Sequence, residues 1–232
     1  MAAIISISVI LTFWSNGNKK ALPQPLAVAA VRDTSVPSEP IAIAGAPTRG
    51  AAGARVAIIE FSDFECRYCG SMARDTMPLV EAKYVATGRL LVVFKHLPLE
   101  PIHQAAARAG AAAECAARQD AFWDMHDELF LSQQRQLDER GLLRRVDALG
   151  LNHDEFLRCL DTDGRQRVAD DVGLAKSIGI ASTPTYLIGE LLPDRRVQVR
   201  HRLAGSVSAE TLGTAIDDTM VREQQARVTE HR

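Results

Sequence analysis

Apolar residues form two strand-like runs in the first half of the chain. Residues 55–61 and 90–94 are short and nearly continuous in apolar character, which is typical of strands buried on both faces. The segment from Cys66 to about Ala86 between them reads as a helix, with Pro78 placed to kink it and Gly88 placed to end it. This strand–helix–strand order predicts two parallel strands at the centre of a sheet.

Helical spacing dominates the next part of the chain. Pro101 is suited to begin a helix, and Asp138 and Asn152 are suited to cap two others, because their side chains accept hydrogen bonds from free backbone N–H groups. Apolar residues recur at helical spacing throughout this part. These signals predict an all-helical insertion over about residues 100–178. Its five helices are expected at about 101–118, 122–130, 138–149, 152–160 and 165–178.

Strand patterns return after this helical part. Residues 185–188 and 197–201 read as a pair of strands, and residues 208–222 read as a closing helix. The sequence therefore predicts one α/β domain over residues 55–222, followed by a polar tail over residues 223–232.

The N-terminal residues differ from the rest in composition. Residues 1–14 contain an uncharged apolar run that is shorter than the roughly 20 residues of a transmembrane helix. We expect this run to be an export signal or a retained membrane anchor, with a buried strand as the alternative. Residues 15–54 are rich in Pro, Ala, Ser and Gly, which predicts a mostly unstructured linker.

The overall composition narrows the function only broadly. The 232 residues are 47 % hydrophobic, which is enough for one domain with a core. The net charge of −2 gives no sign of a nucleic-acid-binding surface. Four cysteines are present, and their positions carry most of the chemical information.

Cys66 and Cys69 stand two residues apart, where the first strand gives way to its helix. A helix N-terminus favours negative charge, so Cys66 is suited to exist as a thiolate, the form that attacks disulfides. Cys69, one helical turn further, can then close an internal disulfide with the same sulfur atom. A zinc site is the alternative, but it needs two further ligands, and the other two cysteines are isolated in the sequence.

A second segment, Thr183-Pro184, favours redox chemistry. With the C-x-x-C helix, the passage from a helix through Thr183-Pro184 into a strand resembles the thioredoxin fold, where the residue before a cis-proline faces the active disulfide. The segments 94–107 and 122–130 are similar to the DsbA-type thiol–disulfide oxidoreductases, which carry a helical insertion within a thioredoxin core. The resemblance covers about residues 50–222.

This resemblance implies an architecture and an activity. We expect an α/β thioredoxin-like fold, with a central mixed sheet flanked by helices and an inserted helical subdomain. We expect a monomeric enzyme, without metal or cofactor, that introduces disulfide bonds into reduced or unfolded exported proteins through a mixed disulfide on Cys66. The bacterial cell envelope would be its location, and a membrane redox partner would reoxidise the dithiol. A reductase or isomerase on the same fold is one alternative, and a binding or chaperone module is another.

The resemblance also assigns roles around the two cysteines. Thr183 and Pro184 are expected to contact the disulfide, and the Thr183 backbone to pair with an extended substrate peptide. In the family, an acid at the position of Glu60 is buried and exchanges protons with the resolving cysteine; a solvated strand-end carboxylate is the alternative. Arg67 and Tyr68 stand where strong oxidases of the family often have Pro-His. Arg67 should lower the pKa of the nucleophile, and Tyr68 should supply an apolar wall.

The remaining candidates depend on pairing and exposure. Cys115 and Cys159 lie on different predicted helices, and an exported protein with two further cysteines favours a structural disulfide, with two buried thiols as the alternative. His103 is a candidate for lining the substrate groove. Asp63 and Glu65 are expected to be surface charges that oppose ionisation of the nearby thiol.

Overall fold

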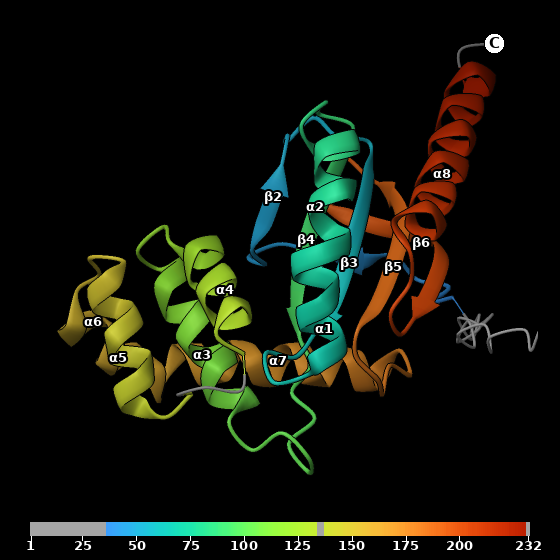
Figure 1. Ribbon diagram of the computed structural model, residues 1–232. Coiled ribbons are helices and arrows are strands. Elements are labelled where there is room, and N and C mark those ends of the chain that lie inside the picture. The colour runs from blue at the N-terminus through green and yellow to red at the C-terminus, as the bar shows by residue number, and fades with distance from the viewer. Residues whose placement is uncertain (1–35, 134–136, 231–232) are drawn as a thin grey trace, which may run out of the picture.

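A six-stranded mixed sheet forms the centre of the molecule (Figure 1). The computed structural model describes residues 36–133 and 137–230, so the apolar segment 1–14 lies outside the described residues. The strand order is β1-β6-β5-β3-β4-β2; β3 and β4 are parallel, as predicted, and the other neighbours are antiparallel. The strands are β1 (Ile41–Ala42), β2 (Thr48–Gly50), β3 (Val56–Ser62), β4 (Leu90–His96), β5 (Thr185–Leu191) and β6 (Arg196–Ala204).

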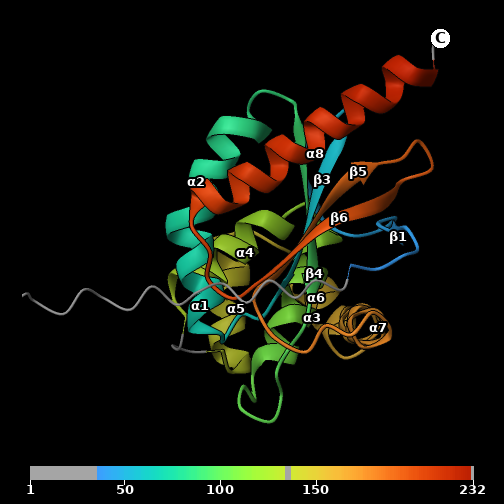
Figure 2. The same cartoon turned by 90° about the vertical axis from the view of Figure 1, so that its right-hand side faces the viewer.

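Every residue of β3 and β4 is buried, because helices cover both faces of the sheet. Ile58 and Val92 face the side covered by α2 (Met77–Val80) and α8 (Ala209–Glu230). Their neighbours Ile59 and Val93 point to the opposite side, which α7 (Asp163–Ser177) covers. Figure 2 shows this layering, with α2 and α8 on one side of the strands and α7 on the other. The continuous apolar runs in the sequence therefore reflect burial on two faces.

The helix after β3 is continuous but changes its winding. It passes from α1 (Arg67–Ser71) through the π-helical segment η1 (Met72–Thr76) and α2 into a second π-helical segment, η2 (Glu81–Val85). Pro78 lies in the first turn of α2, directly after η1, where a widened turn accommodates its missing N–H group. The sequence predicted a kink at Pro78; the structure has π-helical segments on both sides of α2.

Among the described residues, five helices lie between β4 and β5 and form the predicted helical insertion. The side chains of Asp138 and Asn152 accept hydrogen bonds from the backbone N–H groups of Gly141 and Glu155, both at 2.9 Å, as their predicted capping roles require. The five helices are α3 (Ala106–Ala117), α4 (Phe122–Leu131), α5 (Glu139–Ala148), α6 (His153–Leu160) and α7.

The first of these helices begins later than predicted. Pro101 lies in a loop over residues 97–105, and α3 begins only at Ala106. The reason is tertiary: the backbone N–H groups of Leu99 and Ala105 donate to carboxylates on the turn after β3, and these contacts hold the loop open.

The predicted linker and tail are both partly wrong. Within residues 15–54, β1 and β2 add to the two edges of the sheet by pairing with β6 and β4. Ile43 is fully buried, and the indole N–H of Trp123 donates to Thr48 O at 2.9 Å. Backbone pairing with an existing sheet edge orders this segment, which its composition does not reveal. The closing helix α8 continues through the predicted tail to Glu230 and projects beyond the sheet (Figures 1 and 2).

No helix within residues 36–133 and 137–230 combines the length and the apolar character needed to cross a bilayer.

Candidate active site

Cys66 occupies the N-cap position of α1, at the turn that leaves β3. Its backbone N–H donates to Asp63 O at 3.1 Å, and its carbonyl accepts the N–H of Gly70 at 3.0 Å. Cys66 is 4 % exposed, whereas Cys69, one turn further into the helix, is completely buried. Both are free thiols, so the structure represents the reduced form of the pair.

The Thr183–Pro184 peptide bond is cis and brings Thr183 beside Cys66. Cys66 Sγ donates to Thr183 O at 3.6 Å, although the two residues are 117 positions apart in the sequence. Thr183 Oγ1 is buried and has no hydrogen-bond partner among the described residues. Its hydroxyl is therefore free to donate to a thiolate on Cys66.

The two thiols differ strongly in acidity. Hydrogen bonding lowers the pKa of Cys66 to about 5; the Cys69 thiol is the largest cause, and the Cys69 N–H, the Thr183 hydroxyl and the Tyr68 N–H add to it. Burial raises the pKa of Cys69 well above its usual range. At neutral pH the reduced pair therefore holds a thiolate on Cys66 and a protonated thiol on Cys69.

Arg67 does not take the role predicted for it. Its guanidinium carbon lies 5.2 Å from the centroid of the Tyr68 ring, and both side chains are exposed. Hydrogen-bond donors are the groups that contribute most to the low pKa of Cys66, and Arg67 is not among them. Tyr68, which is 54 % exposed, presents an apolar surface beside the nucleophile.

Glu60 lies on β3 directly opposite Tyr186 of β5. It is 3 % exposed, which excludes a solvated strand-end carboxylate, and Oε1 has no hydrogen-bond partner among the described residues. Burial raises the pKa of Glu60 to about 7. Its charge in turn contributes to the raised pKa of Cys69, so the carboxyl group and the buried thiol are electrostatically linked.

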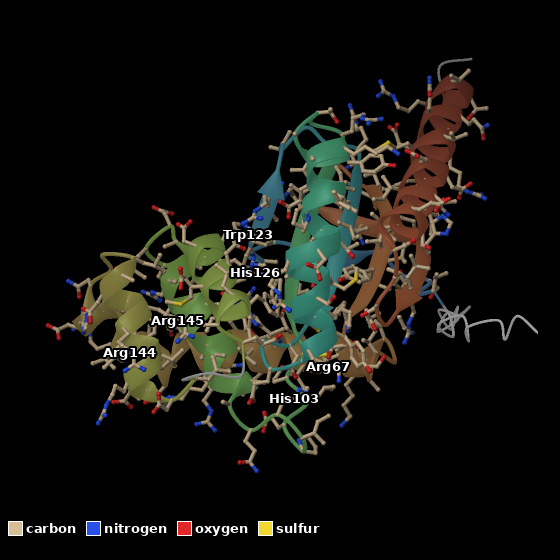
Figure 3. The ribbon with its side chains drawn as sticks, in the orientation of Figure 1. Arg67, His103, Trp123, His126, Arg144 and Arg145 are labelled. Atoms are coloured by element: carbon tan, nitrogen blue, oxygen red, sulfur yellow. A yellow bond between two sulfur atoms is a disulfide. The ribbon has the colours of Figure 1, made fainter. Side chains whose placement is uncertain are left out.

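A cavity of about 350 Å³ reaches Glu60 from between α2 and α4. Arg49 of β2 lies at this cavity, with Nη1 3.0 Å from Glu81 and Nη2 3.4 Å from Asp127. Its guanidinium carbon is 4.3 Å from the ring centroid of Trp123, which Figure 3 shows between β2 and α4. Glu60 is therefore flanked by the dithiol and by a cavity with a charged wall.

The turn before Cys66 contains two carboxylates that were predicted to be surface charges, and this prediction is wrong. Asp63 is 2 % exposed, and Glu65 is half-buried. Asp63 Oδ2 accepts from the Leu99 N–H at 2.8 Å and lies 2.7 Å from His103 Nδ1, while Oδ1 accepts from the Glu65 N–H at 2.7 Å. Glu65 Oε2 accepts from the Ala105 N–H at 2.6 Å. Both carboxylates therefore bind and position the loop over residues 97–105.

Gln133 is a contact that sequence reasoning missed. Its side-chain amide donates to Cys66 O at 2.6 Å and to Phe64 O at 3.1 Å. The residue follows α4, so the helical insertion directly supports the active-site turn. No sequence signal marks this role, because the contacts of a glutamine in a polar loop depend on where the fold places that loop.

The other two cysteines form a disulfide within the helical insertion. Cys115 on α3 is bonded to Cys159 on α6, which confirms the predicted pairing. Gly164 of α7 packs against this disulfide, where a Cβ atom would lie 2.7 Å from Cys115 Sγ and 2.6 Å from Ala111 O. The bridge is buried in the core of the insertion.

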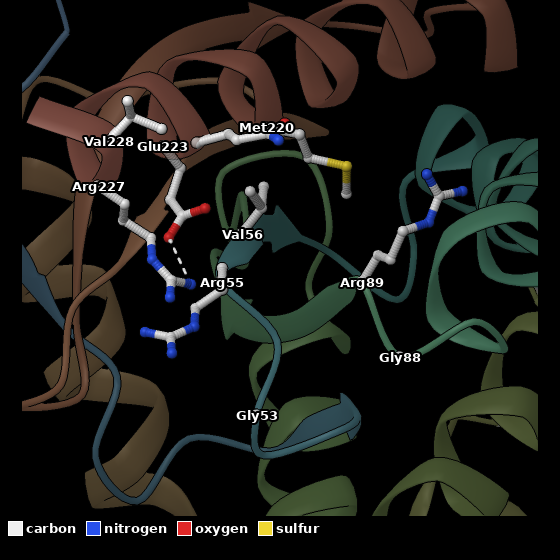
Figure 4. Close-up of a pocket in the computed structure, with 10 residues that line it drawn as sticks. Gly53, Arg55, Val56, Gly88, Arg89, Met220, Glu223, Arg227 and Val228 are labelled. Atoms are coloured by element: carbon white, nitrogen blue, oxygen red, sulfur yellow. Dashed lines mark ion pairs between the residues drawn. The ribbon is translucent and has the colours of Figure 1, made fainter. Parts of the chain in front are cut away.

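No cluster of metal-binding side chains competes with this site within the described residues, and a large cavity elsewhere lacks reactive side chains. Within the described residues, no group of three or more His, Cys, Asp or Glu side chains is arranged to hold a metal ion. A cavity of about 830 Å³ lies between α8 and the start of β3, at the end of that strand away from Cys66 (Figure 4). Arg55, Met220 and Arg227 help to line it, and its lining contains neither cysteine nor histidine.

We expect alkylation of the reduced protein by iodoacetamide to report the acidity of Cys66. The rate at Cys66, assigned by mass spectrometry, should rise with pH around a midpoint near 5 and reach a plateau by neutral pH. Cys69→Ala is the matched variant, because it removes the largest cause of the shift and should move the midpoint upward. An unchanged midpoint in this variant would show that the thiol–thiol hydrogen bond is not the cause.

Comparison with known proteins places this site in a family. The sequence profile of the Thioredoxin family matches residues 44–218. Among solved structures, alpha-DsbA1 of Wolbachia pipientis has a TM-score of 0.69 at 23 % identity, covering 80 % of this chain and 96 % of that chain. BdbD of Bacillus subtilis has a TM-score of 0.63 at 21 % identity, covering 78 % and 96 %. DsbA2 of Pseudomonas aeruginosa has a TM-score of 0.58 at 25 % identity, covering 73 % and 91 %.

The curated relatives that match this chain are named as Na(+)/H(+) antiporters. The Na(+)/H(+) antiporter NhaA 3 of Salinispora tropica is 40 % identical over 141 residues, which are 60 % of this chain and 21 % of that protein. NhaA 1 of Salinispora arenicola is 36 % identical over 169 residues, which are 72 % and 24 %. The chain spans about a fifth to a quarter of the length of these relatives, so their antiporter names say nothing about its own activity. The profile match over most of the described residues, together with these structural neighbours, shows that the chain belongs to the thioredoxin family and has the architecture of DsbA-type proteins.

Proposed function

We propose that this protein is a thiol–disulfide oxidoreductase that introduces disulfide bonds into reduced exported proteins. The low pKa of Cys66, beside the cis Thr183–Pro184 bond, carries the proposal. A stabilised thiolate favours the dithiol over the disulfide, and a pair whose reduced form is stabilised is a strong oxidant.

The reaction begins from the Cys66–Cys69 disulfide. A substrate thiolate attacks Cys66 Sγ, a mixed disulfide forms, and the electron pair of the broken S–S bond passes to Cys69. Glu60, whose pKa is raised to about 7, is placed to give Cys69 a proton. A second substrate thiolate then attacks the substrate sulfur of the mixed disulfide, and Cys66 leaves readily because its thiolate is stable.

The substrate side of the site would be formed by the segment before Pro184. The backbone of Thr183 can pair with an extended peptide, as in strand addition to a sheet edge. Exposed Tyr68 and Arg67 provide further contact surface. The pairing fits unfolded chains better than folded ones, because an extended segment must reach the sulfur atom.

The same proposal extends to the cellular setting. A monomer in the bacterial envelope, exported or anchored through residues 1–14, would oxidise newly exported proteins, and a membrane redox partner would restore its disulfide. Residues 1–14 lie outside the described residues, so this part of the proposal rests on the sequence pattern and on the DsbA-type architecture.

The oxidising strength of the Cys66–Cys69 pair should depend on pH, because Cys66 is unusually acidic. The pKa falls from 9.0 in the reference thiol to about 5 in the folded protein, so ionisation of Cys66 stabilises the folded, reduced form. This contribution is complete above pH 9 and is lost as the pH falls through about 5. The disulfide form gains nothing from it, so the oxidising advantage of the pair over a dithiol of ordinary acidity should shrink as the pH falls toward 5.

The reduction potential of the Cys66–Cys69 pair tests the proposal. We expect a value of about −120 mV at neutral pH, as in strong oxidants, from equilibration in glutathione buffers followed by thiol trapping. The Cys115→Ala/Cys159→Ala variant is the control that restricts the signal to the active pair. A value of about −270 mV would instead identify a thioredoxin-like reductant on the same fold.

A further inference from the structure

A buried carboxylate on the turn before Cys66 holds the imidazole of His103. His103 Nδ1 lies 2.7 Å from Asp63 Oδ2; none of the Asp63 side chain is exposed, whereas 20 % of the His103 side chain is. Because the carboxylate also accepts two backbone N–H groups, it acts as an acceptor, and Nδ1 is the nitrogen that carries the proton. The neutral imidazole then keeps its lone pair on Nε2.

This imidazole is tied to the turn that carries the nucleophile. The carbonyl of Asp63 accepts the Cys66 N–H at 3.1 Å, and the next carboxylate, Glu65, binds the Ala105 N–H. The loop that carries His103 is thus fixed at two points beside Cys66. Figure 3 shows His103 and Arg67 at the same end of the molecule.

The second ring nitrogen of His103 has no hydrogen-bond partner among the described residues. The side chain that carries this nitrogen, Nε2, is partly open to solvent. Asp63 and His103 therefore have the arrangement of an acid–imidazole pair, in which a buried carboxylate fixes the tautomer and the outer nitrogen faces incoming molecules.

A base at this place would speed disulfide exchange, because only the thiolate form of a substrate cysteine attacks the disulfide. The thiol of an ordinary cysteine has a pKa of about 8.5, so roughly 3 % of it is thiolate at pH 7. Glu60 cannot take the S–H proton of the substrate, because Glu60 is buried behind the dithiol on the side of Cys69. Cys66 carries no proton when it is part of the disulfide.

We propose that the Asp63–His103 pair is the base that deprotonates the substrate thiol. The inference rests on the proposed function and adds a catalytic residue to it. The S–H proton of the substrate passes to Nε2 of His103 as the substrate sulfur forms a bond to Cys66 Sγ. The Cys66–Cys69 bond breaks, and its electron pair goes to Cys69 Sγ. In the reverse direction the imidazolium returns the proton to the departing substrate sulfur, so the pair serves reduction and oxidation alike.

The His103→Asn variant separates loss of the base from loss of the contact with Asp63. The asparagine amide can take the place of Nδ1 and still donate to Asp63, but it has no acceptor in the place of Nε2. With the oxidised protein at pH 7, we expect mixed-disulfide formation by a single-cysteine peptide to slow about tenfold; the limit is roughly 30-fold, set by the thiolate already present. With thionitrobenzoate, whose thiol is already ionised, the rate should change less than about twofold. Acid quenching and mass spectrometry follow both reactions.

The wild-type protein offers a second test that does not depend on a variant. Between pH 7 and the pKa of the peptide thiol, a base predicts that the peptide rate falls less than tenfold per pH unit, whereas reaction of free thiolate alone predicts a full tenfold. Equal slowing of both thiols by His103→Asn, or a full tenfold slope in the wild type, would overturn the assignment and leave the proposed function standing. A wild-type protein that reacts with neither thiol would overturn both.

Discussion

Cys66→Ser should reduce disulfide transfer to the uncatalysed rate, whereas Cys69→Ser should react once with a disulfide substrate and remain attached to it. The reason is the opposite environment of the two thiols. Cys66 is held as a thiolate by hydrogen bonds, and Cys69 is completely buried with a raised pKa. Cys69 therefore cannot replace Cys66 as the attacking group, but it is needed to release the bound substrate.

Non-reducing electrophoresis and mass spectrometry of the two variants with a disulfide-bonded peptide distinguish these outcomes. Serine is close to cysteine in size, so the variants keep the packing of the turn, and unfolding curves of both reduced variants serve as the folding control. Disulfide transfer that survives in Cys66→Ser would favour a binding or chaperone module whose thiols are incidental.

The Cys115→Ala/Cys159→Ala variant should lose about 4 kcal/mol of unfolding free energy, since the disulfide closes a loop with a sequence separation of 44 residues. The loss acts mainly through the unfolded chain, whose freedom the disulfide restricts. Both sulfur atoms are also buried in the core of the insertion, so their removal sacrifices packing against Gly164 and its neighbours.

Equilibrium unfolding in guanidinium chloride measures this loss. A background of Cys66→Ser and Cys69→Ser prevents exchange with the active pair during unfolding, and the same background with the disulfide intact is the matched control. A loss below about 1 kcal/mol would show that helix packing alone holds the insertion together.

Elements whose signal is local were predicted correctly from the sequence. The parallel pair β3 and β4 follows from two apolar runs around a helix, and the caps at Asp138 and Asn152 depend on residues three positions away. The C-x-x-C motif likewise identifies its own nucleophile, because the helix start is part of the same segment.

Contacts over long sequence distances account for the errors. Asp63 and Glu65 look like surface charges until the loop over residues 97–105 folds against them and supplies N–H donors. Pro101 looks like a helix start because the sequence does not reveal that these same carboxylates hold residues 97–105 as a loop. The segment with β1 and β2 has the composition of a linker, but it is ordered by edges that other strands provide.

The sequence by itself determined the family, the fold class, the pair Cys66–Cys69 and the candidates for a second disulfide, because these depend on motif order and on the spacing of apolar residues. Only the tertiary structure decided which groups surround the sulfur atoms. Thr183, Gln133, Glu60 and His103 come from four separate parts of the chain, and their distances, burial and hydrogen bonds exist only once the sheet and the helical insertion are assembled. Acidity at this site is therefore a property of the folded arrangement, since a pKa depends on solvent exclusion and nearby donors rather than on residue type alone.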